Sequence, residues 1–347
     1  MARRPGVAHA SWPITTTDLA ALAGSMGAAL ARVPLRRPWD RSGPVLENVV
    51  MATTRETIRT FMGFASSLPI DEWRSVELAL DDLCGVLLPP INDARGVATE
   101  VGSVAGVPGV WYRQHDRAPR ATVLYLHGGG YIGTSPRMYA LFVSALCRLT
   151  QCEFFVADYR LAPEFPFPAG VEDAALVLEA LLHEAGDPGR IFLAGDSGGG
   201  GLVGTLLYVK ASSGIPPIGG VLLFSPEVDL ALDDPSVSDN AALDILPWNI
   251  PTASYLHGRD PAAPAISTVH QDVSHWPPTF VAFGGDEMFR DANRRFVANL
   301  VAAGVETESH EEPGMFHVFP ILMPWASPSR RVFSSLSVFV DKHLPGA

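Results

Sequence analysis

Short apolar runs alternate with helix-like segments over most of the chain. Five runs have the apolar character of buried strands: ATVLYLH, EFFVADY, IFLAG, VLLFS and TFVAFGG. Segments with helical periodicity occur among them, over about residues 136–149, 171–185, 199–212 and 291–303. Two strand-like runs, TEVGSVAG and VPGVWYRQ, precede this series, and TESHEE and a C-terminal helix end it. The alternation predicts an α/β fold in which a mostly parallel, doubly wound sheet carries helices on both faces.

Two stretches of the chain do not follow this rhythm. Residues 1–98 are helix-like, and residues 229–275 are rich in Pro, Asp, Ser and aromatic residues without a strong period. We therefore expect one α/β domain from residues 99–228 and 276–347. A parallel sheet binds its ligand at the carboxyl ends of its strands, so the two excursions are expected to combine as a cap over that edge.

The first 98 residues predict three helices. One covers about residues 18–33, a second begins at a capping box formed by Thr53 and Glu56, and a third runs from about Pro69 to Leu83. The first helix places five apolar residues on one stripe, namely Leu19, Leu22, Met26, Leu30 and Val33. Such a stripe could lie on a membrane surface, but Ala and Gly rather than basic residues occupy its opposite face. That composition favours packing on the protein itself.

Composition and charge narrow the classes of function. The formal charge of -12 disfavours nucleic acid as a partner, because nucleic-acid binding depends on Lys and Arg neutralising phosphates. Three cysteines, Cys84, Cys147 and Cys152, form no C-x-x-C pair and indicate a reducing compartment. No signal-peptide core follows MARRPGVAHASWP, and no apolar stretch approaches the length of a membrane span. We expect a cytoplasmic protein without stable membrane insertion.

The segment FLAGDSGGGG carries the strongest local signal for chemistry. Its residues Gly195 to Gly199 match G-x-S-x-G, between a predicted strand and a predicted helix. A nucleophilic serine needs such a sharp turn, which lifts its hydroxyl clear of the backbone, and Ser197 occupies the required position. A glycine-rich turn in which Ser197 only caps the following helix is the alternative that this motif alone leaves open.

A second glycine-rich loop follows the strand VLYL. His127-Gly128-Gly129-Gly130 has the pattern that supplies backbone N–H groups to an oxyanion hole, and Gly129, Gly130 and Gly198 are the candidate donors. The loop also fits G-x-G-x-x-G, with Glu153 about twenty residues further on, as in dinucleotide binding. A dinucleotide-binding turn opens its helix within the glycines, whereas here the helix is expected only after Pro136, so we set this alternative aside.

A base and an orienting acid are expected after the serine, in the order acid and then histidine. Asp286 directly follows the strand TFVAFGG, and His317 lies in the loop EPGMFHVF after the next short strand. Each could instead be structural, Asp286 as a helix cap and His317 as a buried histidine. Glu287 and Asp291 are the alternative acids. All these features occur in the right order on the right elements, which favours a Ser197–His317–Asp286 triad.

These residues together resemble the hormone-sensitive-lipase group of esterases, known in bacteria as family IV. The resemblance rests on HGGGY, DYRLAPEFPFPAGVED, GDSGGG, Asp286 and the triplet His317-Val318-Phe319, and it spans about residues 95–345. It implies the α/β-hydrolase fold and a serine esterase that needs no metal or cofactor. The chain departs from the group at Gly198, where Ala is usual, and at GDEMFRD, where an Asp-Pro-Leu stretch often surrounds the acid.

Trypsin-like proteases also carry GDSGG around their serine, but their order of residues differs. They are antiparallel barrels with the order His, Asp, Ser, whereas the histidine comes last here. A non-catalytic small-molecule receptor on the same scaffold, such as the plant gibberellin receptors, is a further alternative. Such receptors lack the catalytic histidine, and His317 is present. We therefore expect a carboxylesterase that forms an acyl-enzyme on Ser197.

Small or short-acyl esters are the expected substrates. The family and several bulky residues near the motifs and in the expected cap suggest a confined pocket, with Tyr131, Trp248, Tyr255, Phe289 and Phe316 as candidate lining residues and Met315 nearby. Core packing would explain most of these residues equally well. Lactones, acetylated small molecules and amides are not distinguished by the sequence. A homodimer is expected only from the family.

Overall fold

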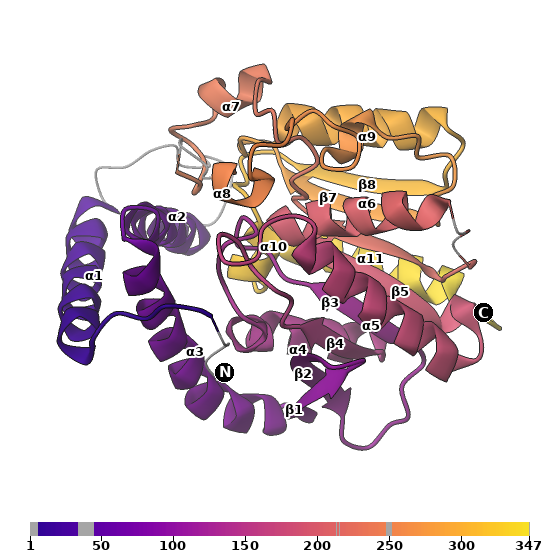
Figure 1. Ribbon diagram of the computed structural model, residues 1–347, viewed down its shortest axis with the longest axis horizontal. Helices are drawn as coiled ribbons and strands as arrows, with labels where there is room; N and C mark the ends of the chain where they lie inside the picture. Colours follow the sequence, from indigo (N-terminus) through magenta and orange to yellow (C-terminus); the bar gives the residue numbers. More distant parts are fainter. Residues whose placement is uncertain (1–5, 34–44, 213, 215, 248–251, 347) are drawn as a thin grey trace.

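The computed structural model describes residues 6–33, 45–212, 214, 216–247 and 252–346. An eight-stranded sheet runs through its centre in the order β1-β2-β4-β3-β5-β6-β7-β8 (Figure 1). The strands are β1 (Val97–Val104), β2 (Val107–Gln114), β3 (Thr122–Leu126), β4 (Glu153–Ala157), β5 (Ile191–Asp196), β6 (Gly220–Phe224), β7 (Thr279–Gly284) and β8 (Thr307–Glu312). The pairs β1–β2 and β2–β4 are antiparallel, and all other neighbours are parallel. The predicted α/β fold with a mostly parallel sheet is confirmed.

Helices cover both faces of the sheet. One face carries α5 (Ala169–Ala185), α6 (Ser197–Ala211) and α9 (Arg290–Ala302), and the other carries α4 (Ala140–Thr150) and α11 (Ser327–His343). Successive residues of a strand point to opposite faces. In β5, Leu193 packs with the first group of helices, while Phe192 and Ala194 pack with the second. The central strands are therefore apolar at nearly every position, as a doubly covered parallel sheet requires.

Three long helices precede the sheet and lie at one side of it, coloured indigo to purple in Figure 1. They are α1 (Trp12–Arg32), α2 (Val45–Ala65) and α3 (Ile70–Asp93). The expected capping box is wrong, because Thr53 lies inside α2, where its hydroxyl donates to the carbonyl of Val49 at 2.8 Å. No helix among the described residues combines the length and apolar character needed to cross a bilayer.

The remaining elements are short. They are η2 (Pro136–Tyr139), η3 (Pro188–Arg190), α7 (Pro235–Asp239), α8 (Ala253–Leu256), η4 (Thr268–His270) and α10 (Phe319–Leu322). Within the stretch 229–275, α7, α8 and η4 are the only helices among the described residues. This stretch joins β6 to β7, so it leaves and re-enters the sheet at neighbouring strands.

Candidate active site

Ser197 stands on a sharp turn between β5 and α6. Its φ is +49°, a left-handed conformation that non-glycine residues rarely adopt, and its side chain is buried. The turn is possible because the neighbouring positions lack side chains. A Cβ at Gly199 would overlap the carbonyl oxygen of Leu126 in β3. The G-x-S-x-G motif therefore forms the strand–turn–helix arrangement that exposes a serine hydroxyl at the edge of the sheet.

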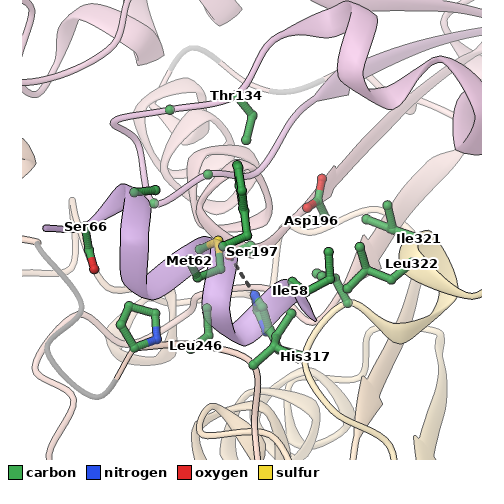
Figure 2. Close-up of a pocket in the computed structure, with 18 of the residues that line it drawn as sticks. Ile58, Met62, Ser66, Thr134, Asp196, Ser197, Leu246, His317, Ile321 and Leu322 are labelled. Atoms are coloured by element: carbon green, nitrogen blue, oxygen red, sulfur yellow. Dashed lines mark hydrogen bonds between the residues drawn. The ribbon is translucent and has the colours of Figure 1, made fainter. Parts of the chain in front are cut away.

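His317 lies in the loop after β8 and contacts this serine. Its Nε2 lies 2.8 Å from Ser197 Oγ, across the dashed line in Figure 2. The histidine follows β8 and is buried, and the ring of Phe289 packs edge-on against the imidazole at 5.0 Å. Burial lowers the pKa of His317 to about 3. The imidazole is therefore neutral at physiological pH, as a base that accepts the serine proton must be.

Glu287 is the carboxylate nearest to the other ring nitrogen of His317. Its Oε2 lies 3.8 Å from His317 Nδ1, and its side chain is fully buried. Three groups donate hydrogen bonds to this carboxyl: Ser225 Oγ at 2.6 Å, the Gly284 N–H at 3.0 Å and Asn293 Nδ2 at 2.8 Å. Burial raises the pKa of Glu287 to about 8, and the three donors oppose that rise. These three bonds hold the carboxyl 3.8 Å from His317 Nδ1, which makes no hydrogen bond among the described residues.

Asp286, the expected acid, does not face the histidine. Its carboxylate is 22% exposed and pairs with Arg55 of α2 at 3.8 Å. The two residues are adjacent, so the turn after β7 sends one side chain inward to the imidazole and the other outward to α2. This placement favours the alternative Glu287 over Asp286 as the acid that acts on His317.

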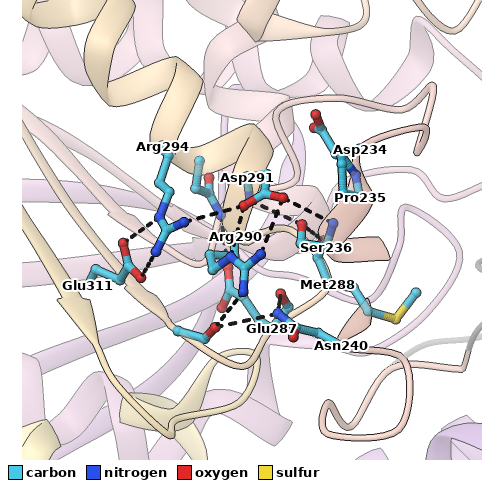
Figure 3. A network of polar contacts seen from close by, with 12 residues as sticks. Asp234, Pro235, Ser236, Asn240, Glu287, Met288, Arg290, Asp291, Arg294 and Glu311 are labelled. Atoms are coloured by element: carbon cyan, nitrogen blue, oxygen red, sulfur yellow. Dashed lines mark hydrogen bonds and ion pairs between the residues drawn. The ribbon is translucent and has the colours of Figure 1, made fainter. Parts of the chain in front are cut away.

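The other alternative, Asp291, is held in a separate network (Figure 3). Its Oδ1 accepts from Arg290 at 2.8 Å, and its Oδ2 accepts from the backbone of Ser236 at 3.0 Å. Arg294 approaches the same carboxylate to 3.6 Å. Hydrogen bonding to Arg290 lowers the pKa of Asp291. This residue fastens α9 to α7 and does not orient His317.

Asp244 was not expected from the sequence, although it links the acid loop to the histidine loop. It is fully buried, and its Oδ1 accepts from the backbone N–H of His317 at 2.9 Å. Its Oδ2 accepts from the N–H of Met288, the residue after Glu287, at 2.7 Å. Asp244 lies in an irregular segment without a motif, so no sequence signal distinguished it from other acidic loop residues.

The expected oxyanion donors lie beside Ser197. A Cβ at Gly198 would lie 3.1 Å from Tyr131 N and 3.3 Å from Gly130 N, so the glycine loop passes closely along the start of α6. Gly129 and Gly130 both have positive φ, at 114° and 60°. Among the described residues, no group accepts a hydrogen bond from the N–H of either glycine. These two N–H groups are therefore free to meet a substrate oxygen, and the N–H of Gly198 lies in the first turn of α6, where helical N–H groups have no partner within the helix.

Arg74 of α3 anchors the loop that carries these glycines. It is buried, and its guanidinium donates to the carbonyl oxygens of Ile132 at 2.6 Å and Ala162 at 2.7 Å. It also forms ion pairs with Glu77 at 3.0 Å and Glu164 at 2.7 Å. The N-terminal helices are thereby joined both to the glycine loop and to the DYRLAPE segment. This fixed charge network holds the loop in one geometry.

A cavity of about 260 Å³ opens over Ser197 and His317. In Figure 2 these two residues lie between a side bordered by Met62, Ser66 and Leu246 and a side bordered by Ile321 and Leu322. The lining comes from α2, α3, the glycine loop, the 240s segment and α10 and is mostly apolar: Ile58, Phe61, Met62, Ala65, Trp73, Ile132, Met138, Ile245, Leu246, Pro247, Phe289, Val318, Ile321 and Leu322 contribute apolar side chains.

Most of the aromatic residues expected in the pocket pack elsewhere. Phe289 lines the cavity, whereas Tyr131, Tyr255 and Phe316 do not. Tyr131 stacks on Tyr255 with ring centroids 3.9 Å apart, and Phe316 is buried beneath Arg55. Trp248 lies outside the described residues. Phe61 of α2 and Trp73 of α3, together with aliphatic side chains and Met62, line the cavity in their place.

A serine on a strand-to-helix turn of a parallel sheet, in contact with a histidine that follows the last strand, is the arrangement of the α/β hydrolases. The family model described as the α/β-hydrolase fold matches residues 123–321. The chain belongs to this fold family and, within it, to the hormone-sensitive-lipase group of bacterial esterases, and it is a carboxylesterase-type hydrolase.

Individual relatives agree with this assignment. The chain is 34% identical to an acetyl-hydrolase of Streptomyces hygroscopicus over 70% of its own length and 82% of that protein. It is 32% identical to carboxylesterase NlhH of Mycobacterium tuberculosis, over 59% and 69% of the two chains. The crystal structure of a hormone-sensitive lipase from a metagenome library superposes with a TM-score of 0.73 at 31% identity, covering 84% of this chain and 98% of that one.

Proposed function

We propose that this protein hydrolyses small, short-acyl carboxylic esters through Ser197 as nucleophile, His317 as general base and Glu287 as the orienting acid. The observation that carries the proposal is the 2.8 Å contact between His317 Nε2 and Ser197 Oγ beneath the apolar cavity. A neutral histidine at this distance from a serine hydroxyl activates it as a nucleophile. The relatives named as esterases and acetyl-hydrolases support the same class of reaction.

In the first half-reaction, Ser197 Oγ attacks the carbonyl carbon while His317 Nε2 takes the hydroxyl proton. The carbonyl oxygen becomes an oxyanion, which the N–H groups of Gly129, Gly130 and Gly198 meet. His317 then returns the proton to the alcohol oxygen as its bond to the carbonyl carbon breaks. The alcohol leaves, and the acyl group stays on Ser197 as an ester.

In the second half-reaction, water takes the place of the alcohol. His317 removes a proton from the water as its oxygen attacks the acyl carbon, and it returns the proton to Ser197 Oγ when the acid departs. Each half-reaction passes through a protonated imidazole. Glu287, 3.8 Å from Nδ1, stabilises that cation and fixes which ring nitrogen faces the serine.

The cavity supports a preference for small substrates. At about 260 Å³ it lies below the roughly 300–1,000 Å³ that is typical of sites for drug-sized ligands. Residues 1–98 and 229–275 act as the cap in this proposal, because α2, α3 and the 240s segment contribute much of the lining. Hydrolysis of lactones or removal of acetyl groups would use the same residues. Location in the cytoplasm and assembly as a homodimer stay predictions.

The test compares p-nitrophenyl acetate, butyrate and palmitate as substrates for the wild type and Ser197→Ala. We expect kcat/KM to be highest for the acetate or butyrate and to fall at least about 10³-fold for each ester in the variant. Exposed Ser238 of α7 provides the control Ser238→Ala, which should behave as the wild type. Faster turnover of palmitate than of butyrate would refute the preference for short acyl groups. Full activity in Ser197→Ala would refute the mechanism.

A further inference from the structure

Glu227 is a buried acid that the proposed mechanism does not use. It follows β6 and is only 1% exposed, and its backbone N–H donates to the carbonyl oxygen of Ser197 at 2.9 Å. Glu227 is also one of the residues that line the catalytic cavity. Its backbone is therefore fixed directly to the proposed nucleophile, beside a cavity that is otherwise lined mainly by apolar side chains.

The carboxyl of Glu227 has no hydrogen-bond partner among the described residues. Its Oε1 is fully shielded and unpaired, and so is the hydroxyl of Tyr255, which is close enough to interact with it electrostatically. Burial raises the pKa of Glu227 to about 8, and no basic side chain counteracts the rise. A buried polar atom without a partner typically costs about 1–3 kcal/mol, so an acid in this position destabilises the fold. Such a cost is typical of residues retained for function rather than stability.

We propose that Glu227 recognises the substrate, by accepting a hydrogen bond from a hydroxyl or protonated amino group that the ester carries near its carbonyl. The inference rests on the proposed function and narrows its substrate class from alkyl esters to esters with a hydrogen-bond donor. The rest of the cavity is mainly apolar, so an unsubstituted alkyl ester fills it but leaves the carboxyl unpaired. A substrate that supplies the missing donor gains that interaction in both the bound and the transition state.

The matched acetates used as probes are propyl acetate, its terminally hydroxylated analogue (propanediol monoacetate) and dimethylaminopropyl acetate. Methyl butyrate and methyl 3-hydroxybutyrate form the equivalent pair on the acyl side. For the wild type, we expect kcat/KM to be about 10- to 100-fold higher for an ester with a donor than for the matched alkyl ester. We expect this preference in one of the two sets, either the one that varies the alcohol or the one that varies the acyl group. Glu227→Met keeps the length of the side chain and should bring that ratio to about one.

Glu227→Gln separates the two kinds of donor. The amide still accepts from a hydroxyl but cannot become an anion for an ammonium group, so a preference for the amino ester should vanish and a preference for the hydroxyl ester should survive. Glu184→Met on exposed α5 is the control for loss of a carboxylate and should leave every ratio unchanged. Because the readout is a ratio within one variant, partial loss of folded protein does not affect it.

The outcomes distinguish this inference from the proposed function. If the wild type hydrolyses none of the esters and Ser197 takes no phosphonate adduct, the proposed function fails. If the wild type hydrolyses them but Glu227→Met leaves the ratios unchanged, Glu227 does not recognise the substrate and the inference is overturned. A lower melting temperature in Glu227→Met would also overturn it, because removing an unpaired buried acid should raise the melting temperature.

Discussion

The carboxylate of Asp244 accepts a hydrogen bond from the backbone N–H of His317, at 2.9 Å. The same carboxylate accepts from the N–H of Met288. One buried side chain of the irregular stretch 229–275 therefore connects the loop that carries His317 to the loop that carries Glu287. Asp244→Ala removes the acceptor of three backbone N–H groups, those of Ile245, Met288 and His317, and each buried donor left unpaired costs about 1–3 kcal/mol. We expect a lower melting temperature and a fall in kcat for p-nitrophenyl acetate. Asp239→Ala, at an exposed position of α7, should change neither.

The two adjacent acids after β7 should differ sharply in their effect on catalysis. Glu287→Gln keeps the shape of the side chain but removes the carboxyl that can become an anion beside the protonated imidazole. We expect kcat/KM for p-nitrophenyl acetate to fall on the order of 10³- to 10⁴-fold. Asp286→Asn loses only a partly exposed ion pair with Arg55 and should cost less than about tenfold. The reverse ranking of the two variants would assign the role of the acid to Asp286.

Arg74 should matter for stability and for the position of the oxyanion loop. Arg74→Met leaves the buried carboxyl of Glu77 and that of Glu164 without their partner, and breaking a buried pair typically costs about 3–5 kcal/mol. It also releases the carbonyl of Ile132. We predict a clear drop in melting temperature and in kcat. Arg113→Met, on an arginine that is 38% exposed, is the control. Equal effects of the two substitutions would contradict the anchoring role.

The effect of Glu227 on the free energy of unfolding should depend on pH. Burial raises its pKa from 4.5 to about 8 in the folded protein, so the unfolded chain loses the proton first as pH rises. The neutral acid is tolerated below pH 4.5, and the native state loses stability progressively as pH rises toward 8. The melting temperature of Glu227→Met should therefore exceed that of the wild type by a margin that grows over this interval. A margin that shrinks with rising pH would mean that the carboxylate is paired in the native state.

The sequence predicted the sheet, Ser197 and His317 because each leaves a pattern. Doubly covered strands are apolar throughout, and a serine turn needs glycines at fixed spacing. The sequence could not choose between Asp286 and Glu287, because both are carboxylates after β7 and only the turn decides which one lies near His317. Tyr131 and Tyr255 were expected in the cavity because the sequence does not distinguish an aromatic residue that lines a pocket from one that packs in the core. Glu227 offered a signal that was missed: like Asp286, it is an acid shortly after an apolar strand.

Covalent labelling tests whether Ser197 is the nucleophile. The wild type and Ser197→Ala are treated with a serine-directed phosphonate, and intact mass and peptide mapping locate any adduct. We predict a single adduct on Ser197 of the wild type, with loss of activity toward p-nitrophenyl acetate in step with labelling, and no adduct on the variant. An adduct at another serine, or none on an enzyme that still hydrolyses the ester, would contradict it.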